Sequence, residues 1–408
     1  MNAGNSTHRA FVRARLNCTP RNSAWPFLET SAAPASATPS PWEALLESNQ
    51  QLGEVESGDQ NPLRPSSRTG PVPQHTTRIR SIDPVCPQRS TNNTNFYSTY
   101  RCGAAYRHAR DGLAYHLHVL LPPPVRPGDT LRIIAPSGPF DRALFFRALG
   151  WLGHRYRVVW DRGCLARSGY LAGDDQRRLQ ELDAALQDPT ARAVVAARGG
   201  YGATRISHLA DFASLARYPK WCVGFSDVTA LHLEAARAGV ASLHASNLVA
   251  LGRADASARE EWLQALEQPL ARRTFGSLHT LVPGRVRGLL AGGNLTLLLC
   301  SAASGRLCLP QGCLLFLEEV SEVPYRIDRM LTSLLISGHL DRVGGFCIGD
   351  LSSDGTPRAA LEVARERLAP LGVPIVAGLP MGHGNVNRYL PLGVPAELGD
   401  GELRINPA

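Results

Sequence analysis

Short apolar runs alternate with longer stretches of helical period in the first half of the folded part of the chain. The runs TLRII, RYRVVW, ARAVVAA and KWCVGF are each followed by glycine or polar residues. Between them, Leu179, Leu182 and Leu186 recur at helical spacing within residues 174–188. Strand, helix and strand in repetition are typical of a parallel sheet covered on both faces. The pattern predicts an α/β domain that binds its ligand at the carboxyl ends of the strands.

The pattern changes after about residue 269, where short strands follow one another more densely. The apolar runs VRGLLAGG, CLLFLEEV, GGFCIGD, PIVAGLP and LRI have the length of strands. Helices are expected over residues 294–303 and 325–337. We interpret this part as a second, smaller α+β domain. The two predicted domains span residues 126–270 and 280–406, and no internal repeat is evident.

The first 120 residues have a different composition. Stretches such as SAAPASATPSPW and STNNTNFYSTY are rich in Ser, Thr, Asn and Pro and show no sustained period. Such a segment cannot bury enough apolar surface to offset the entropy lost on ordering. We expect residues 1–120 to be a disordered or non-domain extension without a part in function. The alternative is a misassigned start codon, which would have to be a non-ATG codon because Met330 is the next methionine.

Composition excludes several classes of function. The formal net charge is +8, but Lys220 is the only lysine, and the arginines are scattered, so no nucleic-acid-binding patch is expected. No run of eighteen apolar residues or signal-like N-terminus is present, so neither a membrane span nor secretion is expected. The nine cysteines are dispersed without a Cys-x-x-Cys pair. This favours a cytoplasmic protein with reduced thiols and no metal site.

The segment Gly224–Thr229 leads from an apolar strand directly into an amphipathic helix, with Ser226 at the corner. That geometry would lift the hydroxyl out of the sheet and direct the helix N-terminus at its target. The backbone N–H of Asp227 would then be a donor to an oxyanion. Helix capping is the alternative role. Val228 replaces the second glycine of the α/β-hydrolase motif, which argues against that fold while leaving a nucleophile possible.

The glycine-rich segment at residues 198–202 (RGGYG) also follows a strand. Clustered glycines let backbone amides approach a substrate oxygen, so Gly200 is the second candidate oxyanion donor. No Gly-Lys-Ser/Thr follows, which excludes a P-loop, and a plain tight turn is the alternative. Arg198 is a candidate partner for a substrate carboxylate. Arg326 and Arg329 are further candidates, although each could equally form a structural ion pair.

A carboxylate and a histidine complete the candidate chemistry. Glu318 follows an apolar strand, and His383 lies between glycines in a loop after another strand. Of the 12 histidines, His383 has the setting best suited to proton transfer. His232 and His244 are expected to be packed or capping residues. A hydroxyl, a base and an acid that orients the base are what acyl transfer requires.

The motifs together resemble a known family. RGGYG, GFSDVTALH, the GGNLT turn at residues 292–296, LFLEEV-x-E-x-PYRIDRML and GLPMGHG occur in order over residues 127–405. This set resembles the LD-carboxypeptidase family of serine peptidases, the muramoyltetrapeptide carboxypeptidases. The resemblance implies a flavodoxin-like N-terminal catalytic domain, a swivelling β/β/α-type C-terminal domain and a homodimer.

Carried over to this chain, the resemblance implies that Ser226 is the nucleophile, His383 the base and Glu318 the residue that orients it. Gly200 and Asp227 match the oxyanion amides. Glu318 is chosen over its neighbour Glu319 because it follows the apolar run directly. No cofactor is implied.

The implied activity is release of terminal D-alanine from murein tetrapeptides during cell-wall recycling in the cytoplasm. Two rivals stay open at this stage. One is a microcin C-type self-immunity peptidase, and the other is a non-catalytic ligand-binding relative.

Overall fold

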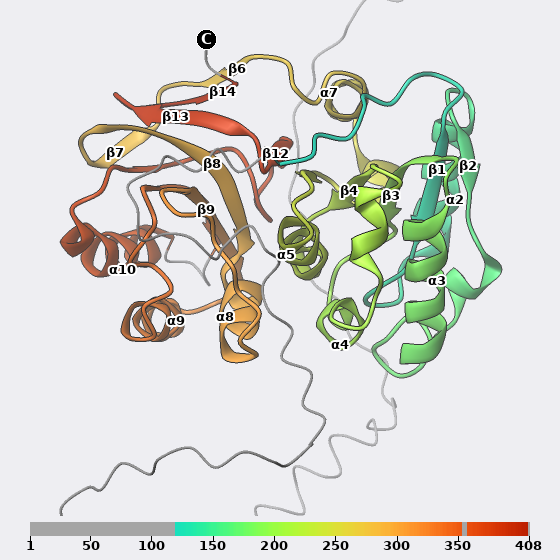
Figure 1. Ribbon diagram of the computed structural model, residues 1–408, viewed down its shortest axis with the longest axis horizontal. Coiled ribbons are helices and arrows are strands. Elements are labelled where there is room, and N and C mark those ends of the chain that lie inside the picture. The colour runs from blue at the N-terminus through green and yellow to red at the C-terminus, as the bar shows by residue number, and fades with distance from the viewer. Residues whose placement is uncertain (1–118, 353–356, 407–408) are drawn as a thin grey trace, which may run out of the picture. The chain divides into compact units, whose positions relative to one another are not determined.

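The protein is represented by a computed structural model that describes residues 119–352 and 357–406 (Figure 1). These residues all fall in one compact unit. The extension predicted over residues 1–120 therefore lies outside the described residues, apart from Val119 and Leu120. Leu120 forms a parallel bridge with Val240.

The first sheet has six strands in the order β12-β5-β4-β3-β1-β2. The strands are β1 (Thr130–Ile134), β2 (Arg157–Val159), β3 (Ala191–Ala196), β4 (Trp221–Gly224), β5 (Ser242–His244) and β12 (Leu390–Leu392). Strands β1 to β5 run parallel, and β12 is antiparallel to β5. The order 2-1-3-4-5 is that of the flavodoxin-like fold, which confirms the predicted class.

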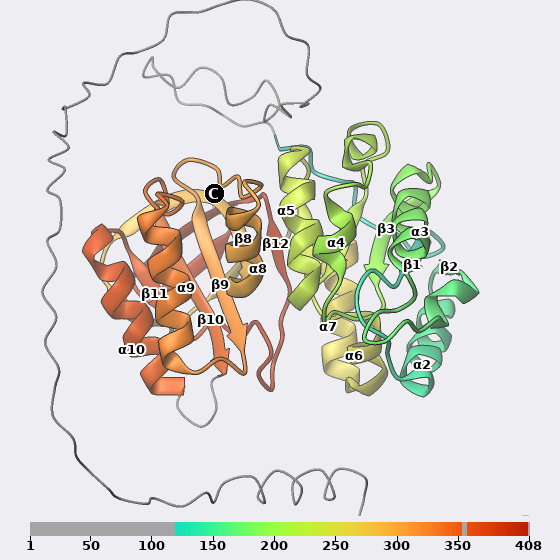
Figure 2. The same cartoon turned by 90° about the horizontal axis from the view of Figure 1, so that it is seen from below.

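Helices cover both faces of this sheet (Figure 2). They are α2 (Arg142–Gly153), α3 (Asp175–Gln187), α4 (Ala203–Ser207), α5 (Thr229–Arg237), α6 (Leu248–Arg253) and α7 (Ala256–Glu267). Short 3₁₀ turns lie at η2 (Arg162–Leu165), η3 (Phe212–Ala216) and η4 (Ser226–Val228). Ala193 and Val195 of β3 pack against α2, α6 and α7, whereas Val194 and Ala196 pack against α3, α4 and α5. Alternating side chains along a strand explain why these runs are apolar throughout.

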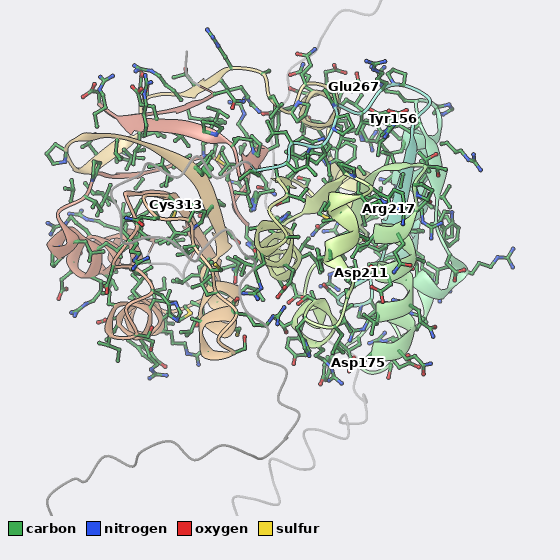
Figure 3. The ribbon with its side chains drawn as sticks, viewed as in Figure 1. Tyr156, Asp175, Asp211, Arg217, Glu267 and Cys313 are labelled. Atoms are coloured by element: carbon green, nitrogen blue, oxygen red, sulfur yellow. The ribbon has the colours of Figure 1, made fainter. Side chains whose placement is uncertain are left out.

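Local polar contacts fix the ends of these helices. Asp141, Asp174 and Asp255 each accept a hydrogen bond from the backbone three residues on, which starts α2, α3 and α7. At the end of α7, Glu267 accepts hydrogen bonds from Arg155 (2.5 Å) and from the Tyr156 hydroxyl (2.5 Å), which lie just before β2 (Figure 3). The end of α7 is thus held to the segment between α2 and β2.

The second sheet has eight strands in the order β6-β14-β13-β8-β9-β10-β11-β7. Its strands are β6 (Arg273–Phe275), β7 (His279–Val282), β8 (Arg285–Asn294), β9 (Leu314–Val320), β10 (Gly345–Ser352), β11 (Ile375–Ala377), β13 (Pro395–Gly399) and β14 (Glu402–Ile405). Its helices are α8 (Leu295–Ala303), α9 (Pro324–Ile336) and α10 (Pro357–Leu368), with the turn η5 (Ala369–Leu371). The helices predicted near 294–303 and 325–337 are confirmed as α8 and α9, whereas α10 was not predicted.

Two cores lie on the two faces of the second sheet. Leu315 and Leu317 of β9 pack on the side of α8, α9 and α10. Leu314 and Phe316 pack on the other side, with apolar residues of β13 and β14. Strands thus lie over one face and helices over the other, as Figure 1 shows. This arrangement agrees with the β/β/α expectation.

One strand does not follow the predicted division at residues 270–280. Strand β12 belongs by sequence to the second predicted domain, yet it forms the edge of the first sheet, where Leu390 is opposite His244. The chain therefore builds β1 to β5 of the first sheet and most of the second, returns to the first with β12, and completes the second with β13 and β14. The domain boundaries themselves stay a prediction.

No helix within residues 119–352 and 357–406 is long and apolar enough to cross a membrane.

Candidate active site

Three polar side chains from distant parts of the sequence meet where the two sheets adjoin. The Nε2 atom of His383 lies 2.9 Å from the Ser226 hydroxyl oxygen. The Nδ1 atom of His383 lies 2.7 Å from Glu318 Oε2. Ser226 follows β4 of the first sheet, Glu318 lies in β9 of the second, and His383 lies in the loop between β11 and β12. The structure thus brings together the three residues that the sequence singled out.

The backbone at Ser226 has an uncommon conformation. Its φ angle is 66°, in the left-handed region that non-glycine residues seldom adopt. Such a conformation costs about 1–2 kcal/mol and is often found at functional sites. Strand β4 ends at Gly224 and the turn η4 begins at Ser226, so the strained residue is the corner itself. The hydroxyl is presented beyond the sheet edge, as a nucleophile requires.

The glycine-rich turn after β3 lies directly against this corner. A methyl group added at Gly199 would lie 3.0 Å from the Ser226 Cβ, so a side chain at this position would press on the Ser226 corner. The next residue, Gly200, has a φ angle of 107°, which favours glycine. The two predicted oxyanion donors, Gly200 and Asp227, therefore belong to the two segments that flank Ser226. Their role as donors stays a prediction.

The Asp227 side chain joins these two segments. It is buried, and its Oδ2 atom accepts a hydrogen bond of 2.8 Å from the backbone N–H of Ala203. Burial raises the pKa of Asp227, although the hydrogen bond from Ala203 acts in the opposite direction. The side chain of Asp227 thus connects the start of α4 to the corner that holds Ser226.

Burial and charge set the protonation of the candidate base. Burial alone would lower the pKa of His383, but the hydrogen bond and charge of Glu318 outweigh it and raise that pKa above 6.5. Burial raises the pKa of Glu318, while its contact with His383 lowers it. The Glu318 side chain is fully buried, whereas 17% of the His383 side chain is exposed. The histidine can therefore exchange protons with a ligand while its partner cannot.

The alternation of side chains along β9 separates Glu318 from Glu319. Strand β9 continues to Val320, so Glu318 lies within the strand and not at its end. Consecutive residues point to opposite faces of a strand, so only one of the two glutamates can reach His383. Glu319 instead accepts hydrogen bonds from Asn294 and from the backbone and hydroxyl of Thr296, at the start of α8.

Two residues missed in the sequence hold His383 in place. The Phe225 ring lies with its centroid 4.9 Å from that of His383. Asn387 accepts a hydrogen bond of 3.1 Å from the backbone N–H of Gly382, immediately before the histidine. Both residues lie within a few positions of a predicted catalytic residue, and that proximity was the available signal. Neither carries reactive chemistry, so a search for nucleophiles and bases passes over them.

A cavity of about 950 Å³ opens beside His383. Its walls come from the histidine loop, from Phe225, and from the segment that contains α6 and the start of α7. The charged side chains on these walls are Arg253, Asp255, Glu261, His383 and Arg388.

The arginines proposed from the motifs have other surroundings. Arg198 donates a hydrogen bond to the carbonyl of Pro139. Arg326 pairs with Glu322 at 3.3 Å, and Arg329 lies over the exposed ring of Tyr325. None of the three arginines lines the cavity beside His383.

Within the described residues, no group of three or more His, Cys, Asp or Glu side chains is arranged to hold a metal ion. His232 and His244, which were expected to be packed residues, are both buried. The His232 Nε2 atom lies 2.9 Å from the carbonyl of Gly224, and burial lowers the pKa of His232 to about 4.

This chain is similar in sequence to a known family of peptidases. Family models described as the LD-carboxypeptidase N-terminal and C-terminal domains match residues 131–245 and 287–398. A Synechocystis sp. protein named as a carboxypeptidase is 39% identical over 296 residues, which cover 69% of this chain and 95% of that protein. The murein tetrapeptide carboxypeptidase of Pseudomonas aeruginosa is 36% identical over 255 residues, 59% of this chain and 82% of that protein.

Solved structures agree in fold. The muramoyltetrapeptide carboxypeptidase of Oxalobacter formigenes superposes with a TM-score of 0.60 at 29% identity, covering 68% of this chain and 97% of that chain. The microcin C7 self-immunity protein superposes with a TM-score of 0.65 at 21% identity, covering 71% and 99%. The family models cover more than half of this sequence, and both of its sheets carry the matched segments. The chain belongs to the LD-carboxypeptidase family and is a peptidase.

Proposed function

We propose that this peptidase is a serine carboxypeptidase that hydrolyses the L,D-peptide bond of murein tetrapeptides and releases terminal D-alanine. The observation that carries the proposal is the chain of contacts from Ser226 through His383 to Glu318. A hydroxyl hydrogen-bonded to an imidazole, which is in turn held by a buried carboxylate, is the arrangement that activates a serine.

In the first half of the reaction, the Ser226 oxygen attacks the carbonyl carbon of the scissile bond. Its proton passes to Nε2 of His383 as the new C–O bond forms. The oxyanion accepts hydrogen bonds from the backbone N–H groups of Gly200 and Asp227. The C–N bond then breaks while His383 returns the proton to the leaving nitrogen, and D-alanine departs.

In the second half, water attacks the ester that joins the tripeptide to Ser226. His383 accepts a proton from this water and returns it to the serine oxygen as the ester bond breaks. The products are the tripeptide acid and the free hydroxyl. Glu318 stays ionised, keeps the imidazole in one tautomer and stabilises its positive charge.

The choice of substrate rests on relatedness and on motifs. The chain is 36% identical to the murein tetrapeptide carboxypeptidase of P. aeruginosa, but only 23% identical to the microcin C7 self-immunity protein of Escherichia coli. The RGGYG and PYRIDR motifs also look more like the branch that recycles the cell wall. A cytoplasmic homodimer acting in murein recycling is part of the same proposal.

The test is incubation with disaccharide-tetrapeptide, read by mass for the loss of one alanine. Ser226→Ala is expected to lower the rate by about 10⁴- to 10⁶-fold with an unchanged circular dichroism spectrum, because loss of one triad member has that effect. Undiminished turnover by this variant would reject the mechanism. A preference for an aminoacyl-nucleotide conjugate over the muropeptide would instead favour the microcin-type activity.

A further inference from the structure

The cavity of about 950 Å³ is lined by His383, the residue that protonates the leaving group in the proposed reaction. In the proposed reaction, His383 returns its proton to the nitrogen of the leaving residue, so that nitrogen must lie within hydrogen-bond reach of Nε2. Neither residues 198–202 nor Asp227, which hold the predicted oxyanion donors, line the cavity. The cavity of about 950 Å³ therefore offers space for the residue that is released beside His383.

Shape alone would not limit this cavity to one small residue. Its volume far exceeds that of a single alanine, so a longer chain could enter by size. A carboxypeptidase must nevertheless select a chain end, and the end differs from an internal position by its free carboxylate. A fixed cation on the cavity wall would make that distinction.

The two arginines of the cavity differ in their partners. Arg388 donates to Glu261 at 2.8 Å, and the same carboxylate oxygen also pairs with Arg273 at 2.6 Å. Arg253 is exposed and forms no ion pair with any residue in the described part of the chain. It is therefore the cavity arginine that has no carboxylate partner within the described residues, whereas Arg388 shares Glu261 with Arg273.

The backbone under Arg253 is firmly held. Arg253 is the last residue of α6, and the preceding Gly252 packs so closely on α2 that an added methyl would lie 2.3 Å from the carbonyl oxygen of Leu144. Arg147 also donates to the Gly252 carbonyl at 3.3 Å. The nearby acid Asp255 is engaged at the start of α7, where it accepts from the N–H of Ala258 at 2.8 Å.

We propose that Arg253 binds the terminal carboxylate of the leaving residue and so makes the enzyme specific for chain ends. This inference rests on the proposed function, because it assigns the leaving side from the role of His383. Its guanidinium can meet a carboxylate with two parallel hydrogen bonds, which fixes the leaving residue in position as well as in charge. Arg253 is a specificity residue and takes no part in proton transfer.

The experiment compares two substrates that differ only at the chain end. One is the murein tetrapeptide as the free acid, and the other is the same peptide with a D-alaninamide terminus. The wild-type protein should prefer the acid by about 10- to 100-fold in kcat/KM, the range expected for one charge-assisted contact. Arg253→Gln should abolish most of this preference by slowing the acid, with a far smaller effect on the amide. Arg253→Lys should keep part of the preference.

Arg358→Gln is the matched control, since it also removes one positive charge, from an exposed pair with Glu362 on α10. It should keep the full preference for the acid. Equal use of acid and amide by the wild-type protein would overturn the inference, as would an unchanged acid preference in Arg253→Gln. Neither result would affect the proposed function, which would fail in this experiment if the wild-type protein released neither D-alanine from the acid nor D-alaninamide from the amide.

Discussion

Ser226 and His383 show how single residues are prepared for chemistry before any ligand is present. The serine is held in a left-handed conformation at the end of a buried strand, where its hydroxyl is 2.9 Å from the imidazole. The imidazole is oriented through its Nδ1 atom by the Glu318 carboxylate, which is fully buried. Both features cost folding free energy, which the surrounding sheets supply.

The charge of Glu318 is expected to set the acidic limb of the pH–rate profile. A general base must be neutral, so activity rises as pH increases through the pKa of His383, which Glu318 raises above 6.5. In Glu318→Gln that contribution is lost and burial lowers the pKa, so the limb should move to lower pH. The rate at the optimum should fall by about 10²- to 10⁴-fold, because the tautomer is no longer fixed.

Measurement of kcat/KM from pH 5 to pH 9 tests this. Glu322→Gln, which removes a nearby carboxylate paired with Arg326, should leave the limb in place. The same linkage affects stability: a histidine with a raised folded-state pKa stabilises the fold fully below its unfolded-state pKa, and this stabilisation is lost as pH rises through the folded value. A limb that stays fixed in Glu318→Gln would contradict the proposed role of Glu318.

At the scale of elements, hydrogen bonds between β9 and the start of α8 stabilise the strand that contains Glu318. Glu319 accepts hydrogen bonds from Asn294, Thr296 and Val320, and the backbone N–H of Asn294 donates to the Thr229 hydroxyl at 3.0 Å. Thr229 begins α5, directly after the turn that holds Ser226. This network connects β9, which contains Glu318, to α5, the helix that follows Ser226.

Glu319→Ala is therefore expected to destabilise the protein more than an ordinary surface change. It leaves several buried donors without partners, which should cost about 2–4 kcal/mol of unfolding free energy. Glu322→Ala removes only a partly exposed ion pair and should cost less than about 1 kcal/mol. Urea unfolding of the two variants gives the comparison. Equal losses would show that the network does not stabilise β9.

The elements differ in how far sequence could predict them. Strands β1, β3, β4, β9 and β10 are buried on both faces, so they appear as continuous apolar runs and were found. Strand β12 is three residues long and contains Pro391, which is compatible only with an edge position, so nothing in its sequence marks it as a strand. Its partner β5 lies about 150 residues away, and such pairing leaves no local pattern.

The candidate site divides in the same way. Ser226, Glu318 and His383 have side chains with distinctive chemistry and lie beside glycines or apolar runs, so sequence singled them out. Arg253 and Asn387 gain their significance only from the cavity and the loop to which the fold brings them. In one sequence with many arginines, Arg253 is not distinguishable from the others.

At the scale of the whole described unit, the two sheets are joined by more than the site. Arg306, just after α8, forms two hydrogen bonds of 2.6 Å with the mostly buried Glu234 of α5. The pairing of β12 with β5 adds backbone hydrogen bonds between the same two halves. We therefore expect the halves to unfold together and not as independent domains.

Two probes can report the halves separately. The described tryptophans, at positions 151, 160, 221 and 262, all lie in the half that contains the first sheet. Cys313 and Cys347 are fully buried in the second half. Tryptophan fluorescence, measured with Trp25 and Trp42 replaced by Phe, and thiol labelling mapped to these two cysteines should show the same urea midpoint. Two separated midpoints would show that each half is stable alone.

The return of the chain through β12 also bears on how such proteins can recombine. A chimaera joined near residue 280 would bring, together with the foreign C-terminal half, the strand that borders the recipient's own nucleophile-bearing sheet. The loop that contains His383 would then lead into β12 from one parent, which pairs with β5 from the other. Hybrids between relatives should therefore depend on whether the donated Leu390–Leu392 segment fits the recipient's Ser242–His244 edge, even when every catalytic residue is the same in both parents.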